Sequence, residues 1–178
     1  LGIATAYPEN QAAGIAARGA GERMCNVAEA DGYSNDICAY ARVSLAYAKL
    51  KECPEQDVAM PDVLLCCNNI CNCMIKWYEN LARNLNIPMI ILDIPFNPDY
   101  EVSDAEVEYV SAQFWDAVHK LEKLFNLKWD DEKFKQVTGF SCRASRAWLD
   151  ATAQAKYVPS PFNGFDLLNH MEIGRAHV

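Results

Sequence analysis

The 178-residue sequence lacks the features that place a chain in a membrane, on a secretory route or on nucleic acid. No apolar run approaches the roughly 20 residues that span a bilayer, and no secretory signal peptide is present. Acidic side chains outnumber basic ones by 24 to 16, and no Lys/Arg stripe interrupts the net charge of −8. This balance argues against nucleic acid as a partner. The sequence therefore predicts a cytoplasmic protein that binds neither membrane nor nucleic acid.

Internal repeats, low-complexity tracts and glycine-rich phosphate loops are also missing. The nearest approach to a dinucleotide-binding fingerprint, Gly19-Ala20-Gly21, follows no predicted strand and lacks the third glycine. Hydrophobic residues make up 51% of the chain, which is enough for the core of one domain or slightly more.

Cysteine, by contrast, is abundant. The chain has eight cysteines, and four of them lie within residues 66–73. A disulfide scaffold does not fit, because the chain is too long and too rich in amphipathic helix for that class. A zinc knot within 66–73 is a weaker alternative, because the usual pairing of cysteines on both sides and a nearby histidine are missing. The thiols instead indicate a reduced and anaerobic interior.

Residues 62–95 are the most informative stretch. Residues 63–67 and 89–92 are apolar runs typical of strands buried on both faces. Between them a stripe of Met74, Tyr78, Leu81 and Leu85 predicts a helix. A strand–helix–strand unit this short predicts a parallel pair of strands with a right-handed crossover.

Cys71 falls where the first of these strands ends and the helix begins. Open α/β sheets place ligands at this edge, and the start of a helix favours the negative charge of a thiolate. The alternative is a buried cysteine that packs the start of the helix. The adjacent Cys66 and Cys67 point to opposite faces of a strand and are expected to be core residues.

Cys38 has a similar context. It follows Ser34-Asn35-Asp36, which we predict to be the N-cap of a helix that continues to about residue 50. Two cysteines, each in the first turn of a helix, can converge on one site if both helices begin at the same edge of the sheet.

The remaining elements are predicted in less detail. Residues 1–7 read as the end of a strand, and residues 8–31 read as mostly helical. Ser103 and Glu106 form a capping box that opens a long helix, and a second helix follows from about 131 to 156. The first of these helices carries one apolar face, made of Val107, Val110, Phe114, Val118, Leu121 and Phe125.

These elements predict an α/β domain over residues 1–100, with cysteine-bearing turns between strand and helix. A helical segment follows over 101–157, and a Pro/Gly linker over 158–171 leads into a truncated second α/β domain. Residues 172–178, EIGRAHV, look like the translation of a sequencing adapter and are expected to be a non-native tail, so that the chain is an internal fragment.

Four segments together resemble the 2-hydroxyacyl-CoA dehydratase family, which is related to the ATP-dependent benzoyl-CoA reductases. They are YPEN at 7–10, GYSNDICAYAR at 32–42, NNICNCMIKWYENLA at 68–82 and NIPMIILDIP at 86–95. The similarity runs in order over roughly residues 5–125. It implies a Rossmann-like three-layer α/β domain with a parallel sheet, followed by a helical segment and a second α/β domain that is missing here.

The resemblance also implies a function. The chain would be a subunit of an iron–sulfur lyase that removes water from an (R)-2-hydroxyacyl-CoA through a ketyl radical, after ATP-driven one-electron activation. The implied partners are a homologous second dehydratase subunit, an ATP-dependent activator protein and the acyl-CoA substrate. The alternatives are a benzoyl-CoA-reductase-like subunit and a non-catalytic subunit that carries a cluster or serves as a scaffold.

Four site residues follow from the same resemblance. Cys38 and Cys71 match the first two cysteine ligands of a [4Fe-4S] cluster, and the third ligand is expected outside this chain. Cys142 is a poor substitute because it lies in the middle of a predicted helix. Glu9, as a catalytic carboxylate, and Asn10 are placed beside the acyl-CoA. The alternative for Glu9 is a glutamate that the dipole favours at a helix N-terminus.

Overall fold

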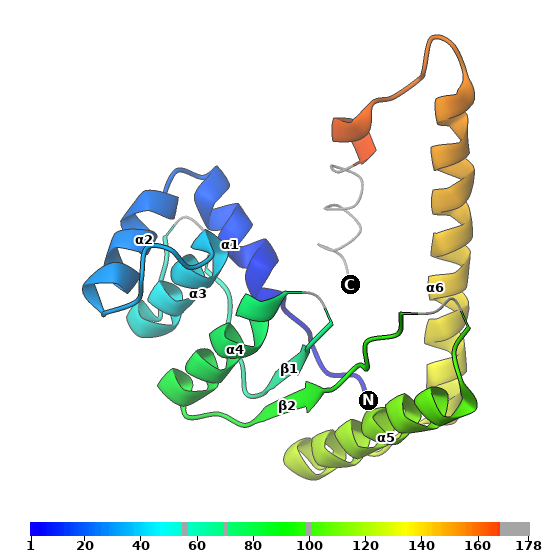
Figure 1. Cartoon of the computed structure of the whole chain (residues 1–178), viewed down its shortest axis with the longest axis horizontal. Helices are drawn as coiled ribbons and strands as arrows, with labels where there is room; N and C mark the ends of the chain where they lie inside the picture. Colours follow the sequence, from blue (N-terminus) through cyan, green and yellow to red (C-terminus); the bar gives the residue numbers. More distant parts are fainter. Residues whose placement is uncertain (55–56, 70, 99–100, 168–178) are drawn as a thin grey trace. The chain divides into compact units, whose positions relative to one another are not determined.

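The structure is a computed structural model that describes residues 1–54, 57–69, 71–98 and 101–167. The described part of the chain is mixed α/β and mostly helical (Figure 1). It divides into two compact units: one covers Ala6–Asn126, and the other combines Leu1–Thr5 with the chain from Leu127 onward. The first unit holds α1 (Pro8–Ala17), α2 (Gly21–Ala30), α3 (Ala39–Leu50), β1 (Leu64–Cys67), α4 (Asn72–Leu85), β2 (Met89–Leu92) and α5 (Asp104–Phe125). The second unit holds α6 (Asp131–Thr152) and the 3₁₀ helix η1 (Ala153–Lys156).

The predicted strand–helix–strand unit is confirmed. Strands β1 and β2 pair in parallel, with Leu64 opposite Met89 and Cys67 opposite Leu92, and α4 connects them. Helix α4 ends at Asn86, which takes the left-handed conformation that asparagine tolerates at a helix C-terminus. The crossover therefore has the compact form that the apolar pattern predicted.

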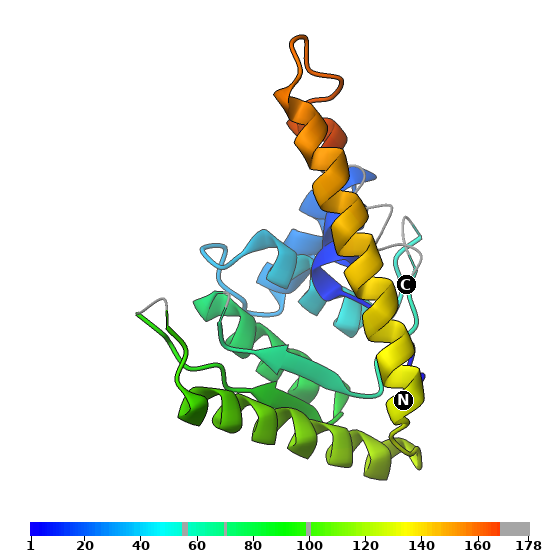
Figure 2. The same cartoon turned by 90° about the vertical axis from the view of Figure 1, so that its right-hand side faces the viewer.

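Helices cover both faces of this two-stranded sheet. Leu64 and Cys66 pack in one core cluster with residues of α3 and α4. Ile90 and Leu92 pack on the other face with Ala117 of α5. Figures 1 and 2 show α4 and α5 on opposite sides of the strands. The first unit thus has three layers: helix, sheet and helix.

The strands are not buried on both faces as predicted. Leu65 of β1 is 48% exposed and Ile91 of β2 is 42% exposed. Each face of the sheet is covered by a helix that lies mainly over one strand: α4 packs mainly on β1, and α5 packs on β2. Each helix therefore leaves one apolar side chain of the other strand uncovered.

A second core cluster lies among the first three helices. Ile15, Met24, Val43 and Cys53 are its largest fully buried side chains. Burial of such a side chain contributes about 1.5–3 kcal/mol. Helix α3 contacts α1, α2 and α4. It therefore joins this cluster to the core cluster that contains Leu64 and Cys66, which lies between the sheet and helices α3 and α4. The helical prediction for residues 8–31 is confirmed.

Two local predictions near the start of the chain are wrong. Residues 1–7 form no strand, since no described strand lies beside them to complete a ladder of hydrogen bonds. The N-cap of α3 is Cys38 and not the Ser34-Asn35-Asp36 run. The Ser34 hydroxyl instead accepts a hydrogen bond from the Asp36 N–H at 3.2 Å, which closes a local turn before the helix.

The capping box at the start of α5 is confirmed. The Glu106 N–H donates to Ser103 Oγ at 3.3 Å, and the Ser103 N–H donates to the Glu106 carboxylate at 2.9 Å. The apolar face predicted for this helix is only partly buried. Val107 and Phe114 are more than half exposed, because α5 turns Ala117 toward the narrow sheet.

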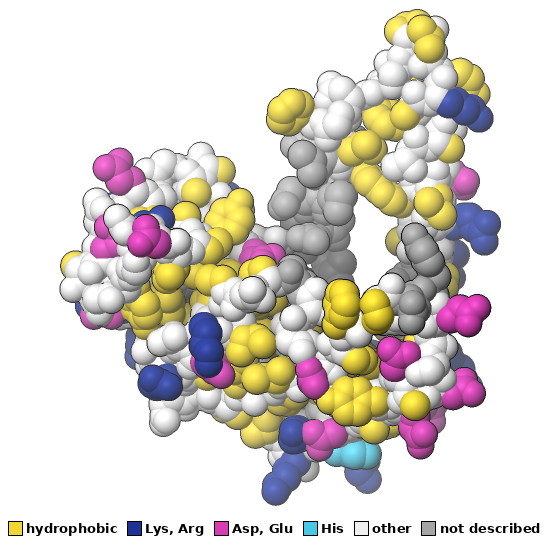
Figure 3. Space-filling model, viewed as in Figure 1, with side chains coloured by type: hydrophobic (Ala, Val, Ile, Leu, Met, Phe, Trp, Pro, Cys, Tyr) yellow, Lys and Arg dark blue, Asp and Glu magenta, His cyan; other side chains and the backbone are white. Residues whose placement is uncertain are grey.

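In the second unit, α6 and η1 together confirm the predicted helix. The N-cap of helix α6 is Asp130, whose carboxylate accepts from the Lys133 N–H at 3.0 Å. None of its residues is buried, and its large apolar side chains remain exposed, including Phe134, Val137, Phe140 and Leu149. Figure 3 shows hydrophobic side chains, in yellow, on the surface of the helix.

Among the described residues, no helix combines the length and apolarity needed to cross a bilayer. The end of the predicted linker, 168–171, and the predicted non-native tail, 172–178, lie outside the described residues.

Candidate thiolate site at the carboxyl end of the sheet

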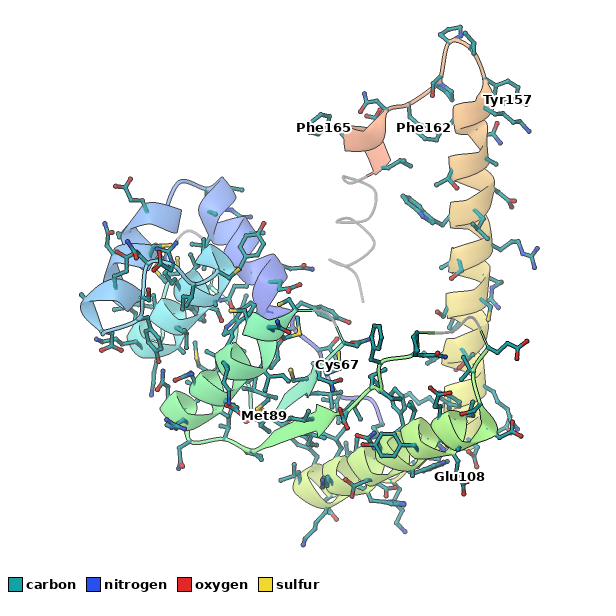
Figure 4. The ribbon with its side chains drawn as sticks, viewed as in Figure 1. Cys67, Met89, Glu108, Tyr157, Phe162 and Phe165 are labelled. Atoms are coloured by element: carbon teal, nitrogen blue, oxygen red, sulfur yellow. The ribbon has the colours of Figure 1, made fainter. Side chains whose placement is uncertain are left out.

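Cys71 lies at the start of α4, as the sequence predicted. It is the N-cap residue, with the extended backbone angles φ −141° and ψ 152°, and its side chain is exposed. Cys67, which ends β1, lies just before it in the chain (Figure 4). The unpaired N–H groups of a first helical turn favour an anion, so this position suits a thiolate.

Cys38 occupies the equivalent position on α3. It is the N-cap residue, and its side chain is also exposed. The two helices pack against each other in one core cluster. Just before α3, the Tyr33 hydroxyl accepts a hydrogen bond from Asn84 Nδ2, near the end of α4, at 2.9 Å. The two predicted ligands begin adjacent helices, but the contact with Tyr33 lies at the end of α4 opposite to Cys71, and a common site for the two sulfur atoms stays a prediction.

These two residues fit an iron–sulfur cluster in kind but not in number. Exposed thiols at helix starts are the donors that such a cluster needs. Among the residues that the structure describes, no three Cys, His, Asp or Glu side chains are grouped so as to hold a metal ion. Cys142 is exposed on α6, in the other unit. The described residues therefore offer two exposed thiols at helix starts and no complete ligand set.

Cys66 is the opposite kind of cysteine. Its side chain is 4% exposed, and burial, followed by the charge of Cys67, raises the pKa of its thiol to about 11. Its Sγ donates to the carbonyl oxygen of Cys67 at 3.4 Å. A thiol with this pKa remains protonated near neutrality and is a poor metal ligand. The prediction that Cys66 is a core residue is confirmed.

Glu9 and Tyr78 approach the same end of β1. Glu9 lies in the first turn of α1, with Asn10 beside it, as a glutamate favoured by the helix dipole would. Tyr78 is buried on α4, and burial, followed by the charges of Cys66 and Glu9, raises the pKa of its phenol to about 12. The phenol therefore stays a neutral hydrogen-bond donor. Sequence reasoning favoured helix packing for Tyr78 over a cofactor-binding role, and its place in the apolar stripe gave no sign of its proximity to Glu9.

Sequence reasoning also missed a polar network at the ends of both strands. Asp93 follows β2, and its carboxylate accepts hydrogen bonds from Asn68 Nδ2 and from the Tyr109 hydroxyl, the latter at 2.6 Å. The hydrogen bond to Asp93 raises the pKa of Tyr109. Gln113 of α5 holds the backbone of Asp93 through two further hydrogen bonds. The sequence signal was a polar residue directly after each strand, Asn68 after β1 and Asp93 after β2.

The fold and the site together define an α/β unit with cysteines at two helix starts beside a parallel sheet. The sequence matches the family described as 2-hydroxyglutaryl-CoA dehydratase, D-component, over residues 4–176. The chain belongs to this family.

Several curated relatives are dehydratase α subunits. The chain is 53% identical to the (R)-phenyllactyl-CoA dehydratase alpha subunit of Clostridium sporogenes over 173 residues, which cover 97% of the chain and 42% of the relative. It is 45% identical to the (R)-2-hydroxyisocaproyl-CoA dehydratase alpha subunit of Clostridioides difficile, over 94% of the chain and 41% of the relative. It is 42% identical to the lactoyl-CoA dehydratase subunit alpha of Anaerotignum propionicum, over 97% and 44%. The chain thus spans less than half the length of these relatives.

Proposed function

We propose that this chain forms the cysteine-bearing α/β part of the α subunit of an iron–sulfur (R)-2-hydroxyacyl-CoA dehydratase. The observation that carries the proposal is the match of almost the whole chain to dehydratase α subunits, at up to 53% identity. The names of these relatives differ in the acyl group and agree in the reaction. The proposal therefore extends to the reaction class and leaves the acyl group open.

In this proposal Cys38 and Cys71 hold a [4Fe-4S] cluster, and a third cysteine comes from a part of the subunit outside this chain. When bound, such a cluster would pass one electron, delivered by the ATP-dependent activator protein, to the substrate thioester. A thiolate at each helix start is stabilised by the dipole of α3 or α4. The buried Cys66 takes no part, because its raised pKa keeps it a thiol.

We assign the proton chemistry to the polar groups near the start of α1. Removal of the hydroxyl group requires loss of a proton from the β carbon of the acyl group, and a carboxylate is a suitable general base. Glu9 is our candidate for this base, and Asn10 for a substrate-binding residue. The neutral phenol of Tyr78, near Glu9, can donate a hydrogen bond that fixes the carboxylate.

The same proposal predicts the fold of the whole subunit. Strands β1 and β2 would be part of a larger, Rossmann-like parallel sheet, and the helices that connect its further strands would cover Leu65 and Ile91 on its two faces. A second α/β domain would follow the helical segment. A homologous second subunit and an ATP-dependent activator protein would complete the enzyme.

The test uses the extended reading frame, produced anaerobically with its neighbouring subunit and activator. We expect about four irons per subunit and ATP-dependent dehydration of an (R)-2-hydroxyacyl-CoA. Cys38→Ser and Cys71→Ser should each lose both the iron and the activity. Cys73→Ser is the matched control, because Cys73 lies two residues further along and packs in the core above the sheet, and it should keep both.

The 178-residue chain alone should bind iron poorly and show no activity, since it has only two well-placed thiols. Stoichiometric iron in this chain would refute the assignment and point to Cys73 or Cys142 as a further ligand. Iron binding without dehydration in the complete enzyme would favour a cluster-carrying subunit. Reduction of an aromatic acyl-CoA would favour the benzoyl-CoA-reductase-like alternative.

A further inference from the structure

We propose that Asn68 and Asp93 are positioning residues that fasten the chain directly after β1, three residues before Cys71, onto the end of β2. This inference rests on the proposed function for its consequence, the placement of a cluster ligand. The fastening itself is a property of the apo chain and can be tested without iron.

A side-chain bridge joins the ends of the two strands. Asn68 follows β1 and Asp93 follows β2, 25 residues apart in the sequence. The side-chain amide of Asn68 donates through Nδ2 to the Asp93 carboxylate. Its Oδ1 accepts from the Ile94 N–H at 2.7 Å. One asparagine side chain therefore uses a donor and an acceptor to continue the pairing of the strands beyond their last residues.

Asp93 is itself anchored by hydrogen bonds to side chains of α5. Its N–H donates to Gln113 Oε1 at 2.6 Å, and its carbonyl oxygen accepts from Gln113 Nε2, also at 2.6 Å. The Tyr109 hydroxyl donates to the other carboxylate oxygen at 2.6 Å. Both residues belong to α5, the helix that packs on β2. Asp93 is thus held through both its backbone and its side chain, independently of the hydrogen bond that its carboxylate accepts from Asn68.

Asn68 lies only a short distance along the chain from Cys71, the proposed cluster ligand. Cys71 is three residues after Asn68, and three residues span at most about 11 Å. The position of Asn68 therefore limits where Cys71 can lie. A metal ligand has to be held to within about 0.5 Å to bind well, so the groups that orient it affect metal affinity.

The test is a double-mutant cycle. Asn68→Asp places two carboxylates face to face, and Asp93→Asn removes one of the two acceptor oxygens that Asp93 offers. In the double variant the two groups exchange roles. The introduced amide donates to the introduced carboxylate, while Ile94 N–H and the Tyr109 hydroxyl each keep an acceptor. The double variant should therefore restore what each single variant loses.

The first readouts are made on the reduced, metal-free 178-residue chain. Each single variant should increase amide hydrogen exchange of the peptide that contains residues 66–74 by about tenfold, as expected for the loss of one or two hydrogen bonds. The alkylation rate of Cys71 should change about threefold or more, while Cys38 in the same sample stays unchanged. Asn84→Ala, which removes the hydrogen bond to Tyr33, is the matched control and should leave both readouts unchanged.

The final readout is the iron content of the complete enzyme. Both single variants should bind about tenfold less iron at limiting supply, and the double variant should recover. Unchanged exchange and alkylation in Asn68→Asp, or no recovery in the double variant, would overturn the inference. If the exchange results hold and the wild-type enzyme binds no iron, the proposed function fails and the fastening stands.

Discussion

The buried thiol of Cys66 should make the stability of this protein depend on alkaline pH. The ordinary pKa of a cysteine in an unfolded chain is about 9.0, and in the folded chain burial raises the pKa of Cys66 to about 11. The folded state therefore holds the proton more strongly than the unfolded state between these values. Stability is fully present below pH 9 and is lost as the pH rises toward 11.

The size of the effect follows from the two pKa values. At pH 10 the difference in proton binding lowers the free energy of unfolding by about 1.4 kcal/mol relative to pH 7. The variant Cys66→Ala lacks the thiol at this position and should not show the loss of stability that its titration causes. The cost of removing the buried sulfur is the same at both pH values, so it cancels when the pH dependence of the two proteins is compared.

The assay is urea unfolding of the reduced chain at pH 7 and pH 10, followed by circular dichroism. Leu64→Ala is the matched control: Leu64 is buried in the same core cluster as Cys66 and carries no titratable group, so its removal should leave the pH dependence intact. If Cys66→Ala loses as much stability as the wild type between pH 7 and pH 10, within about 0.3 kcal/mol, the buried-thiol reasoning is refuted.

Three further predictions concern the helices. Ser103→Ala should destabilise the first unit by about 1 kcal/mol in urea unfolding, because it removes half of the capping box of α5; an unchanged midpoint would contradict this. Leu81→Ala should cost about 2–5 kcal/mol, because this side chain is 3% exposed between α4 and α3, whereas Arg83→Ala, on the exposed side of α4, should change stability by less than about 0.5 kcal/mol. Spin labels on Cys38 and Cys71, with the other cysteines replaced, should report by pulsed EPR a separation compatible with Cα atoms within about 15 Å, since thiolates further apart cannot bind one cluster.

Local patterns in the sequence determined most of the secondary structure. The apolar runs at 63–67 and 89–92 and the helical stripe between them predicted the parallel unit, because side-chain periodicity directly reflects the backbone conformation. The position of Cys71 at a helix start and the capping box at Ser103 follow from neighbours within a few residues. Features with a local cause were therefore predictable.

The tertiary structure alone decided which surfaces and polar groups meet. The exposure of Leu65 and Ile91 depends on the offset of α4 and α5 over a two-stranded sheet, and no local pattern encodes that offset. The bridge from Asn68 to Asp93 joins residues 25 positions apart, and either side chain by itself reads as an ordinary loop residue. The raised pKa of Cys66 likewise comes from burial that only packing creates. The sequence determined where thiols lie along the chain, and the fold alone buried the sulfur of Cys66, since desolvation depends on the layers that close around it.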